Sequence, residues 1–392
     1  EFGELLKIDI RSPQRKREVV IPARENHRLT AGVYQSGHYL MQYYSAGYDS
    51  LALFDENGKF VRDITPVAGG SISSLTAYDS GDKDAENNRP KGTLAANEKD
   101  YKRYVWFYYQ NKVTPTTTYR YNVEEDKFFG VKRRDTIPFD ADKYEMRTVS
   151  YPSKDGTMVP IVISHKKGLK LDGKNPTLLY GYGGFEVSLT PYYSGGIGKT
   201  WLTRKTASGR SGVYVVANIR GGGEYGPRWH QAALKEKRHK AYEDFAAVAR
   251  DLTQRGIADP AHLGIQGGSN GGLLMGNMLT KYPELFGAIV IQVPLLDMQR
   301  YNKLLAGASW MAEYGDPDKA EEWAYIRPFS PYPLFDPAKK YPPVLFTTST
   351  RDDRVHPGHA RKMMAKMEAA GKDALYYENV EGGHGGAADN KQ

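Results

Sequence analysis

Residues 265–272 of this chain read Ile-Gln-Gly-Gly-Ser-Asn-Gly-Gly, and this is the most informative stretch of the sequence. The apolar run Leu263–Ile265 leads into it and predicts a strand, while the run Leu273–Lys281 that follows predicts a helix. Ser269 then lies in a tight turn between strand and helix, with glycine two residues before it and two residues after it. Glycines suit such a turn because Cβ atoms there would collide with the neighbouring elements. The pattern predicts a serine nucleophile at a helix N-terminus, and an ordinary glycine-rich turn is the alternative.

An acid and a histidine follow the serine in the order that the catalytic triad of an α/β-hydrolase requires. The apolar, β-branched run Val344–Thr348 predicts a strand, and Asp352 and Asp353 come just past its end. The strand expected at Leu375–Tyr377 is followed by His384, which has two glycines on each side. Open α/β sheets hold their chemistry at the carboxyl ends of their strands. We therefore expect the histidine to take the serine proton and one of the two aspartates to orient the imidazole.

Several further blocks are distinctive. They are LYGYGGF at 179–185, ANIRGGGEYG at 217–226, GGSNGG at 267–272, Trp310 with EYG at 313–315, DDRV at 352–355 and GHG at 383–385. In this order the blocks resemble the prolyl oligopeptidase family, proline-directed serine peptidases with an α/β-hydrolase domain and a β-propeller. The resemblance extends from about residue 151 to the C-terminus.

The resemblance implies roles for individual residues. Ser269 matches the nucleophile, His384 the base and Asp352, the first of the two acids, the triad aspartate. The hydroxyl of Tyr182 and the backbone N–H of Asn270 match the oxyanion hole. A phenol O–H is a fixed donor for a tetrahedral oxyanion, which agrees with that role.

The resemblance also implies a proline pocket. Trp310 matches the indole that stacks on the proline ring of the substrate, and Arg354 the arginine that binds the peptide carbonyl one residue further out. The rest of the apolar pocket matches Phe185, Leu295, Tyr314 and Val355. An aromatic slot suits proline because its ring is rigid and apolar and lacks an N–H group. Taken without the resemblance, the apolar members of this set would also fit an ordinary core.

Two other motifs point to rival functions. The glycines of 221–226 fit the dinucleotide pattern G-x-G-x-x-G after a predicted strand at Val213–Ala217. That site needs a helix opening at the glycines, but Pro227 follows and the next clear helix is expected only near Ala241. His356 and His359 have the spacing of two metal ligands, yet no third ligand is evident. We therefore predict no dinucleotide, no metal and no other cofactor.

Composition narrows the range of partners. The chain has 392 residues, no cysteine and a net charge of +8, and no stretch approaches the ~18 apolar residues that cross a bilayer. The basic runs Arg15–Arg17 and Lys235–Lys240 are short and lack interleaved aromatic residues, which favours solvated surface over nucleic-acid binding. We expect a monomer that binds short proline-containing peptides and neither nucleic acid nor membrane. The compartment stays open between cytoplasm, periplasm and the extracellular space.

The first 140 residues are richer in short strands. Candidate strands occur at 39–44, 51–54, 104–109 and 116–123, with turns at 55–58 and 124–126, and the polar stretch 68–100 predicts a long exposed excursion. Repeated antiparallel units of this kind predict propeller blades. We therefore expect part of a propeller, two or three blades, at 1–140 and an α/β-hydrolase domain at 141–392. Only eight residues follow His384 (392 − 384), so we expect a fragment of a longer peptidase that lacks the closing C-terminal helix.

The sequence thus predicts a serine oligopeptidase that cleaves after proline through an acyl-enzyme. An oligopeptidase of basic specificity is the main alternative, with Glu313 and Asp316 as candidate acids. An acylaminoacyl peptidase or an esterase could use the same triad. A non-catalytic binding module built on the propeller strands is the alternative from another class.

Overall fold

The computed structural model describes residues 2–11, 13–77, 104–133 and 140–386. The chain divides into two compact units. The first comprises Glu1–Met146, Thr190–Lys199 and Glu224–Gly226, and the second comprises Arg147–Leu189, Thr200–Gly223 and Pro227–Gln392. Among the helices described, none has both the length and the apolar composition needed to cross a bilayer.

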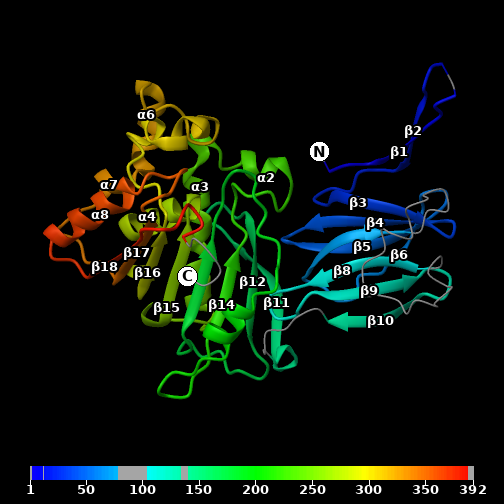
Figure 1. Ribbon diagram of the computed structural model, residues 1–392, viewed down its shortest axis with the longest axis horizontal. Helices are drawn as coiled ribbons and strands as arrows, with labels where there is room; N and C mark the ends of the chain where they lie inside the picture. Colours follow the sequence, from blue (N-terminus) through cyan, green and yellow to red (C-terminus); the bar gives the residue numbers. More distant parts are fainter. Residues whose placement is uncertain (1, 12, 78–103, 134–139, 387–392) are drawn as a thin grey trace. The chain divides into compact units, whose positions relative to one another are not determined.

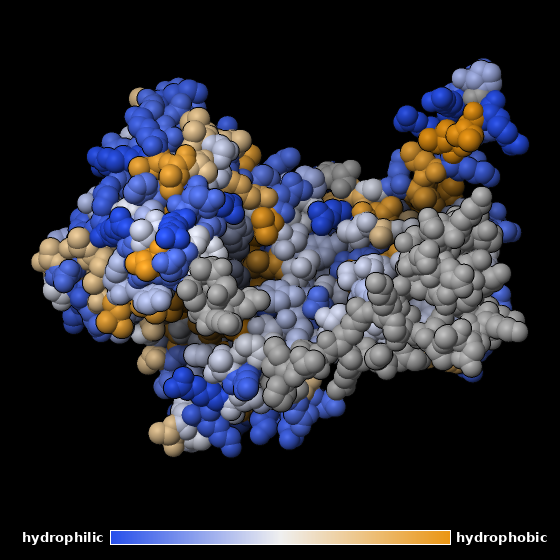
Figure 2. Space-filling view, viewed as in Figure 1, coloured by the Kyte–Doolittle hydropathy of each residue, from blue (hydrophilic) through white to orange (hydrophobic). Residues whose placement is uncertain are grey.

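The first unit is built from antiparallel strands (Figure 1). β1 (Leu5–Ile8) and β2 (Arg17–Ile21) form a hairpin, along which Figure 2 shows exposed hydrophobic surface. Ile8, Ile10 and Val19 are among the exposed large hydrophobic residues of the chain. One four-stranded meander has the strands β3 (Arg28–Gln35), β4 (His38–Ser45), β5 (Tyr48–Asp55) and β6 (Phe60–Asp63). A second has β7 (Ser71–Thr76), β8 (Tyr104–Gln110), β9 (Thr117–Asn122) and β10 (Lys127–Arg133). The short helix α1 (Gly195–Ile197) also belongs to this unit.

The two meanders share one core, as neighbouring propeller blades do. Leu40 and Leu53 of the first pack in the same buried cluster as Val105 and Phe107 of the second. The four strands predicted in this region are confirmed with small shifts at their ends. One expectation was wrong: the excursion predicted at 68–100 contains β7, which pairs with β8, and its remainder from residue 78 lies outside the described residues.

The second unit is organised by an eight-stranded sheet with the order β11-β12-β14-β13-β15-β16-β17-β18. Its strands are β11 (Tyr144–Pro152), β12 (Met158–Lys166), β13 (Thr177–Gly181), β14 (Val213–Ala217), β15 (Leu263–Gly268), β16 (Ala288–Gln292), β17 (Val344–Ser349) and β18 (Ala374–Asn379). β12 is antiparallel to β14, and the strands from β14 to β18 are parallel. The predicted fold class, an α/β-hydrolase fold preceded by part of a β-propeller, is confirmed.

Helices cover one face of this sheet. The long ones are α3 (His239–Gln254), α4 (Asn270–Lys281) and α8 (Gly358–Ala369), and the short ones are α2 (Pro227–Gln231), α5 (Met311–Tyr314), α6 (Ala320–Ile326) and α7 (Pro331–Leu334). Side chains of α3, α4 and α8 share a buried cluster with Ile265, Ile291 and Phe346 of the sheet. Side chains alternate between the two faces along each strand, and these three residues lie on the face that the helices cover. On the opposite face of β15 to β18 most of the alternate side chains stay partly exposed, among them Leu375 and Tyr377 of β18, whereas β14 is buried on both faces.

This topology sets the position of the site. From β13 the chain goes to β14 on one side and then to β15 on the other side, so the strand order reverses at β13. In open parallel sheets, ligands bind beyond the carboxyl ends of the strands at such a point. Tyr182 follows β13, Ser269 follows β15, Asp352 comes after β17 and His384 after β18.

Candidate active site

Ser269 occupies a strained turn between β15 and α4. Its backbone has a φ of 59°, a conformation that residues other than glycine rarely adopt. Ser269 is also the N-cap of α4. A Cβ atom on Gly267 would lie 2.5 Å from the carbonyl oxygen of Gly271, and one on Gly271 would lie 2.9 Å from that of Gly181. The turn therefore tolerates no larger residue at these two positions. It presents the serine, which is partly exposed, at the start of a helix whose N–H groups face the same region.

His384 and Asp352 are joined by a hydrogen bond. The distance from His384 Nδ1 to Asp352 Oδ2 is 2.8 Å, and the aspartate is 4% exposed. The second oxygen, Oδ1, accepts from the backbone N–H groups of Arg354 and Val355, each at 2.9 Å. Burial alone would raise the pKa of Asp352, but these hydrogen bonds from His384 and the two amides lower it below the ordinary value. The carboxyl group is thus held ionised, while the neighbouring Asp353 is exposed.

The Tyr182 hydroxyl lies close enough to Ser269 for this serine to lower the pKa of the phenol slightly. Tyr182 follows β13, and β13 pairs directly with β15, so the two residues leave adjacent strands. Burial raises the pKa of Tyr182, which keeps its hydroxyl protonated near neutral pH. The phenol is therefore a donor placed beside the serine.

The predicted pocket residues share one region of the core. Leu295, Tyr314 and Val355 are buried in the large apolar cluster, and Phe185 and Trp310 pack against it while keeping part of their surface exposed. The rings of Phe185 and Tyr314 meet edge to face, with centroids 5.6 Å apart. Phe185 and Trp310 therefore keep aromatic surface exposed, and the ring of Phe185 rests against the buried Tyr314.

Arg354 is exposed, and its backbone connects the acid loop to the segment of Trp310. The carbonyl oxygen of Arg354 accepts from the N–H of Ala306 at 3.2 Å, in the 3₁₀ turn Leu305–Trp310. The Arg354 side chain is exposed to solvent.

Sequence analysis missed a buried charge cluster beneath these residues. Arg238 is 1% exposed although it lies in the basic run 235–240 that we assigned to solvated surface, so that assignment was wrong for this residue. It is buried because its Nη1 donates to Glu313 Oε1 at 2.7 Å and its Nη2 donates to Asn270 Oδ1. No pattern in the sequence signals this pairing, because Glu313 lies 75 positions further along the chain.

Glu313 also bears on specificity. Its Oε1 accepts from Arg238, and its Oε2 lies 2.6 Å from Nε2 of His230. With 4% exposure it is not an open carboxylate for a basic substrate side chain. Asp316, the other acid considered, is hydrogen-bonded to Asn302 and to the backbone of Asp318.

The glycine stretch 221–226 forms a structural loop. Arg220, which precedes it, donates to Asp244 and to Asp155, with closest distances of 2.6 Å in each case. The helix that follows, α2, has five residues and opens at Pro227. The geometry therefore lacks the long helix that holds a pyrophosphate.

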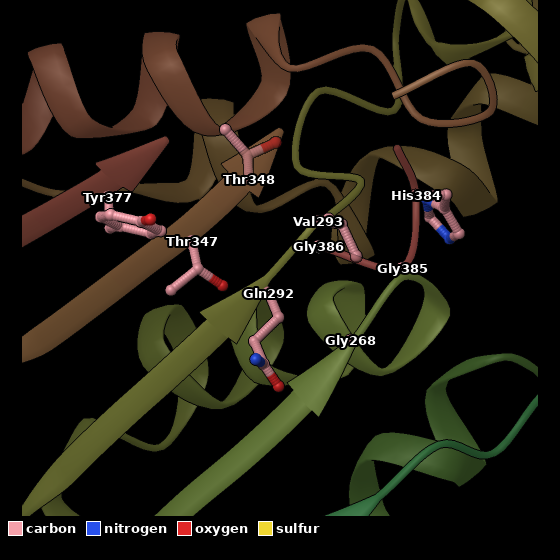
Figure 3. A pocket seen from close by; sticks show the side chains of 9 residues that line it. All are labelled: Gly268, Gln292, Val293, Thr347, Thr348, Tyr377, His384, Gly385 and Gly386. Atoms are coloured by element: carbon pink, nitrogen blue, oxygen red, sulfur yellow. The ribbon is translucent and has the colours of Figure 1, made fainter. Parts of the chain in front are cut away.

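A cavity of about 420 Å³ lies next to the His384 loop on the partly exposed face of the sheet. It is lined by Gly268, Gln292, Val293, Thr347, Thr348, Tyr377, His384, Gly385 and Gly386 (Figure 3). In the close-up the His384 ring points away from the side chains of Thr347 and Tyr377. Across the residues that the structure describes, no three His, Asp or Glu side chains gather closely enough to hold a metal ion.

Comparison with known proteins gives consistent matches. Residues 200–392 match the model of the prolyl oligopeptidase family. An uncharacterized peptidase of Sinorhizobium fredii is 40% identical over 98% of this chain and 49% of its own length. A prolyl endopeptidase of Elizabethkingia meningoseptica is 34% identical over 99% of this chain and 51% of its own length.

Solved structures agree. One from a study of two prolyl endopeptidases is 34% identical, with a TM-score of 0.79 over 98% of this chain and 53% of that chain. A post-proline cleaving enzyme of Rickettsia typhi is 33% identical, with a TM-score of 0.74 over 94% of this chain and 50% of that chain. The chain spans about half the length of the curated relatives it matches. It belongs to the prolyl oligopeptidase family of serine peptidases.

Proposed function

We propose that this chain carries a serine-peptidase site that cleaves short peptides after proline. The observation that carries the proposal is the arrangement around the elbow of β15 and α4. Ser269 lies there in a strained turn, Tyr182 follows the adjacent strand β13, and a His384–Asp352 pair joined at 2.8 Å follows two further strands of the same sheet. These are the groups that nucleophilic acyl transfer needs.

In the first half of the reaction, Ser269 Oγ attacks the carbonyl carbon of the proline residue in the peptide. His384 Nε2 takes the hydroxyl proton, and ionised Asp352 stabilises the resulting imidazolium. The tetrahedral oxyanion accepts hydrogen bonds from the Tyr182 hydroxyl and from the backbone N–H of Asn270 at the start of α4. His384 then donates its proton to the leaving amine nitrogen as the C–N bond breaks, which leaves an ester between proline and Ser269.

The second half repeats these steps with water as the nucleophile. His384 takes a proton from the water molecule, the hydroxide attacks the ester carbonyl, and the proton returns to Ser269 Oγ as the C–O bond breaks. The same oxyanion donors act twice. No group beyond the side chains and backbone of this chain is needed.

The preference for proline rests on the pocket of Phe185, Trp310 and Tyr314. Partly exposed aromatic rings offer a flat apolar surface to a pyrrolidine ring. A pocket for arginine would need an unpaired carboxylate, and the candidate acid Glu313 is already bonded to Arg238 and His230. The chemistry around the site thus favours proline over a basic residue.

The test is hydrolysis of two chromogenic peptides that differ only in proline or arginine before the cleaved bond, by wild type and by Ser269→Ala. We expect cleavage after proline that is lost in the variant. Cleavage after arginine alone would refute the pocket assignment and keep the triad. A folded wild-type chain that cleaves neither peptide and does not react with a fluorophosphonate would contradict the proposal and favour a binding role.

A further inference from the structure

The buried cluster around Arg238 contacts both parts of the proposed site. Arg238 and Glu313 are 1% and 4% exposed, and their ion pair is 2.7 Å long. Burying two charges is costly unless each is fully hydrogen-bonded. The pair lies beneath the proposed site, and its hydrogen bonds show which groups of the site it holds in place.

On one side the pair reaches the oxyanion hole through Asn270. Oδ1 of Asn270 accepts from Arg238 Nη2 and from the Tyr314 hydroxyl, the latter at 2.7 Å, and its Nδ2 donates to the Tyr182 carbonyl oxygen at 2.7 Å. Two donors at the oxygen fix which way the amide faces. The Asn270 side chain thereby links its own residue, whose backbone N–H is one proposed oxyanion donor, to Tyr182, whose hydroxyl is the other.

On the other side the pair reaches the proline pocket through Glu313. Oε1 of Glu313 also accepts from the backbone N–H of Phe185 at 2.9 Å. Phe185 and Glu186 have φ of 57° and 56°, a strained conformation for residues other than glycine. The hydrogen bond to Glu313 helps hold this strained segment, which carries one wall of the pocket.

The charge of Arg238 acts in the same region. Its guanidinium lies 5.1 Å from the centre of the Tyr314 ring. Burial raises the pKa of Tyr182, and the positive charge of Arg238 is the strongest influence in the opposite direction. Arginine keeps this charge even when buried. A fixed positive charge next to the Tyr182 phenol strengthens it as a donor to an oxyanion.

We infer that Arg238 and Glu313 are a positioning pair that couples the proline pocket to the oxyanion hole. Arg238 orients Asn270, and through it Tyr182, while Glu313 holds both Arg238 and the Phe185 backbone. The inference rests on the proposed function. Arg238 acts on the transition state, because the donors that it orients through Asn270 bind the developing oxyanion, whereas Glu313 also holds a wall of the substrate pocket.

The test compares wild type with Arg238→Met, Arg238→Lys and the double variant Arg238→Met/Glu313→Gln, all in the full chain. With a proline peptide we expect kcat to fall about 10- to 100-fold in Arg238→Met, short of the 10²–10³ for loss of an oxyanion donor itself, with KM changed less than threefold. Affinity for a peptide aldehyde ending in prolinal should fall by a similar factor, because its hemiacetal oxygen uses the same donors. Arg238→Lys keeps the charge and should recover part of both losses.

A matched control is the ion pair of Arg210 and Asp172, which is 2.6 Å long and partly buried. It lies before β14 and β13, at the amino ends of the strands. Arg210→Met should leave kcat and aldehyde affinity within twofold of wild type. If near-ultraviolet circular dichroism shows that Arg238→Met does not fold, the double variant provides the same readouts. It removes both buried charges together, so no unpaired charge remains in the core.

The outcomes separate the two ideas. An active wild type whose kcat and aldehyde affinity survive in Arg238→Met or the double variant refutes the positioning pair and keeps the proposed function. Equal losses in the Arg210→Met control would also refute it. A wild type that neither cleaves the proline peptide nor reacts with a fluorophosphonate refutes the proposed function, and the inference fails with it.

Discussion

His384 and His359 show one side chain in two opposite environments of the same unit. His384 has a side chain 15% exposed, and its Nδ1 lies 2.8 Å from a carboxylate oxygen of Asp352. His359, on α8, is 2% exposed, and its Nδ1 lies 3.2 and 3.0 Å from the backbone nitrogens of Leu296 and Asp297. A carboxylate can only accept, whereas backbone N–H groups can only donate.

The partner of Nδ1 therefore sets the role of each histidine. Beside Asp352, Nδ1 must carry the proton, so Nε2 of His384 is the free base. At His359, Nδ1 must be the acceptor, so the ring is a neutral link between α8 and the segment after β16. Burial lowers the pKa of His359 to about 4, despite the opposing charge of Asp297; Lys362 and His356 lower it further. The comparison separates the proposed proton carrier, His384, from the structural residue His359.

Removing the carboxylate should have the largest effect. Asp352→Asn offers the ring an amide that can donate, which permits the wrong tautomer, and kcat for a proline peptide should fall about 10⁴-fold. The free energy of unfolding should change little by comparison. Asp353→Asn is the matched control, since Asp353 is exposed and adjacent, and its kcat should stay within twofold. Retention of more than a tenth of the activity in Asp352→Asn would contradict the role of His384.

The pH dependence of activity should follow the base. A protonated imidazole cannot take the serine proton, so kcat/KM should fall toward tenfold per pH unit once acidification protonates the base. The ionised state of Asp352 persists throughout, because hydrogen bonding lowers its pKa. Initial rates of wild type from pH 5 to 8 measure this, with circular dichroism at each pH to show that the chain stays folded. A flat profile would be inconsistent with a histidine base.

The pH dependence of stability should follow the other histidine. Its pKa, about 4 when folded against 6.5 ordinarily, means that the unfolded chain binds its proton more readily. The stabilisation is therefore complete above pH 6.5 and is lost as the pH falls from 6.5 to 4, by roughly 3 kcal/mol in all. Urea unfolding at pH 7 and 5 should show a loss for wild type that is smaller in His359→Asn, whose amide oxygen can accept the same N–H groups. His262→Asn, at an exposed histidine, should leave the wild-type pH dependence intact.

The elements of the candidate site were accessible to sequence analysis because their signals are local. The elbow around Ser269 and the strands before Asp352 and His384 are short apolar runs followed by characteristic loop residues. Local pattern left Asp352 and Asp353 equivalent, and only the resemblance favoured the first. The physical difference, two backbone N–H groups directed at one carboxylate, depends on a loop conformation that composition does not encode.

Long-range pairing was not accessible in this way. Arg238 has the sequence context of a surface residue, and its burial depends on Glu313 and Asn270, which approach only in the folded chain. β7 was missed for a related reason. Its residues, Ser71–Thr76, are mostly small and polar, so pairing with the aromatic strand β8 decides its conformation more than intrinsic propensity does.

The smallest expected effect is that of a chelator. It tests whether His359, the structural member of the comparison with His384, instead binds a metal. His356 and His359 have the spacing of metal ligands, but Nδ1 of His359 is occupied by backbone donors and Nδ1 of His356 accepts from the N–H of Gly358 at 2.9 Å. Because triad chemistry needs no metal, EDTA should leave kcat for the proline peptide and the urea midpoint unchanged within error. A loss that added zinc restores would show that these histidines serve a metal after all. It would also show that the partner of Nδ1 does not decide the role of a histidine in this fold.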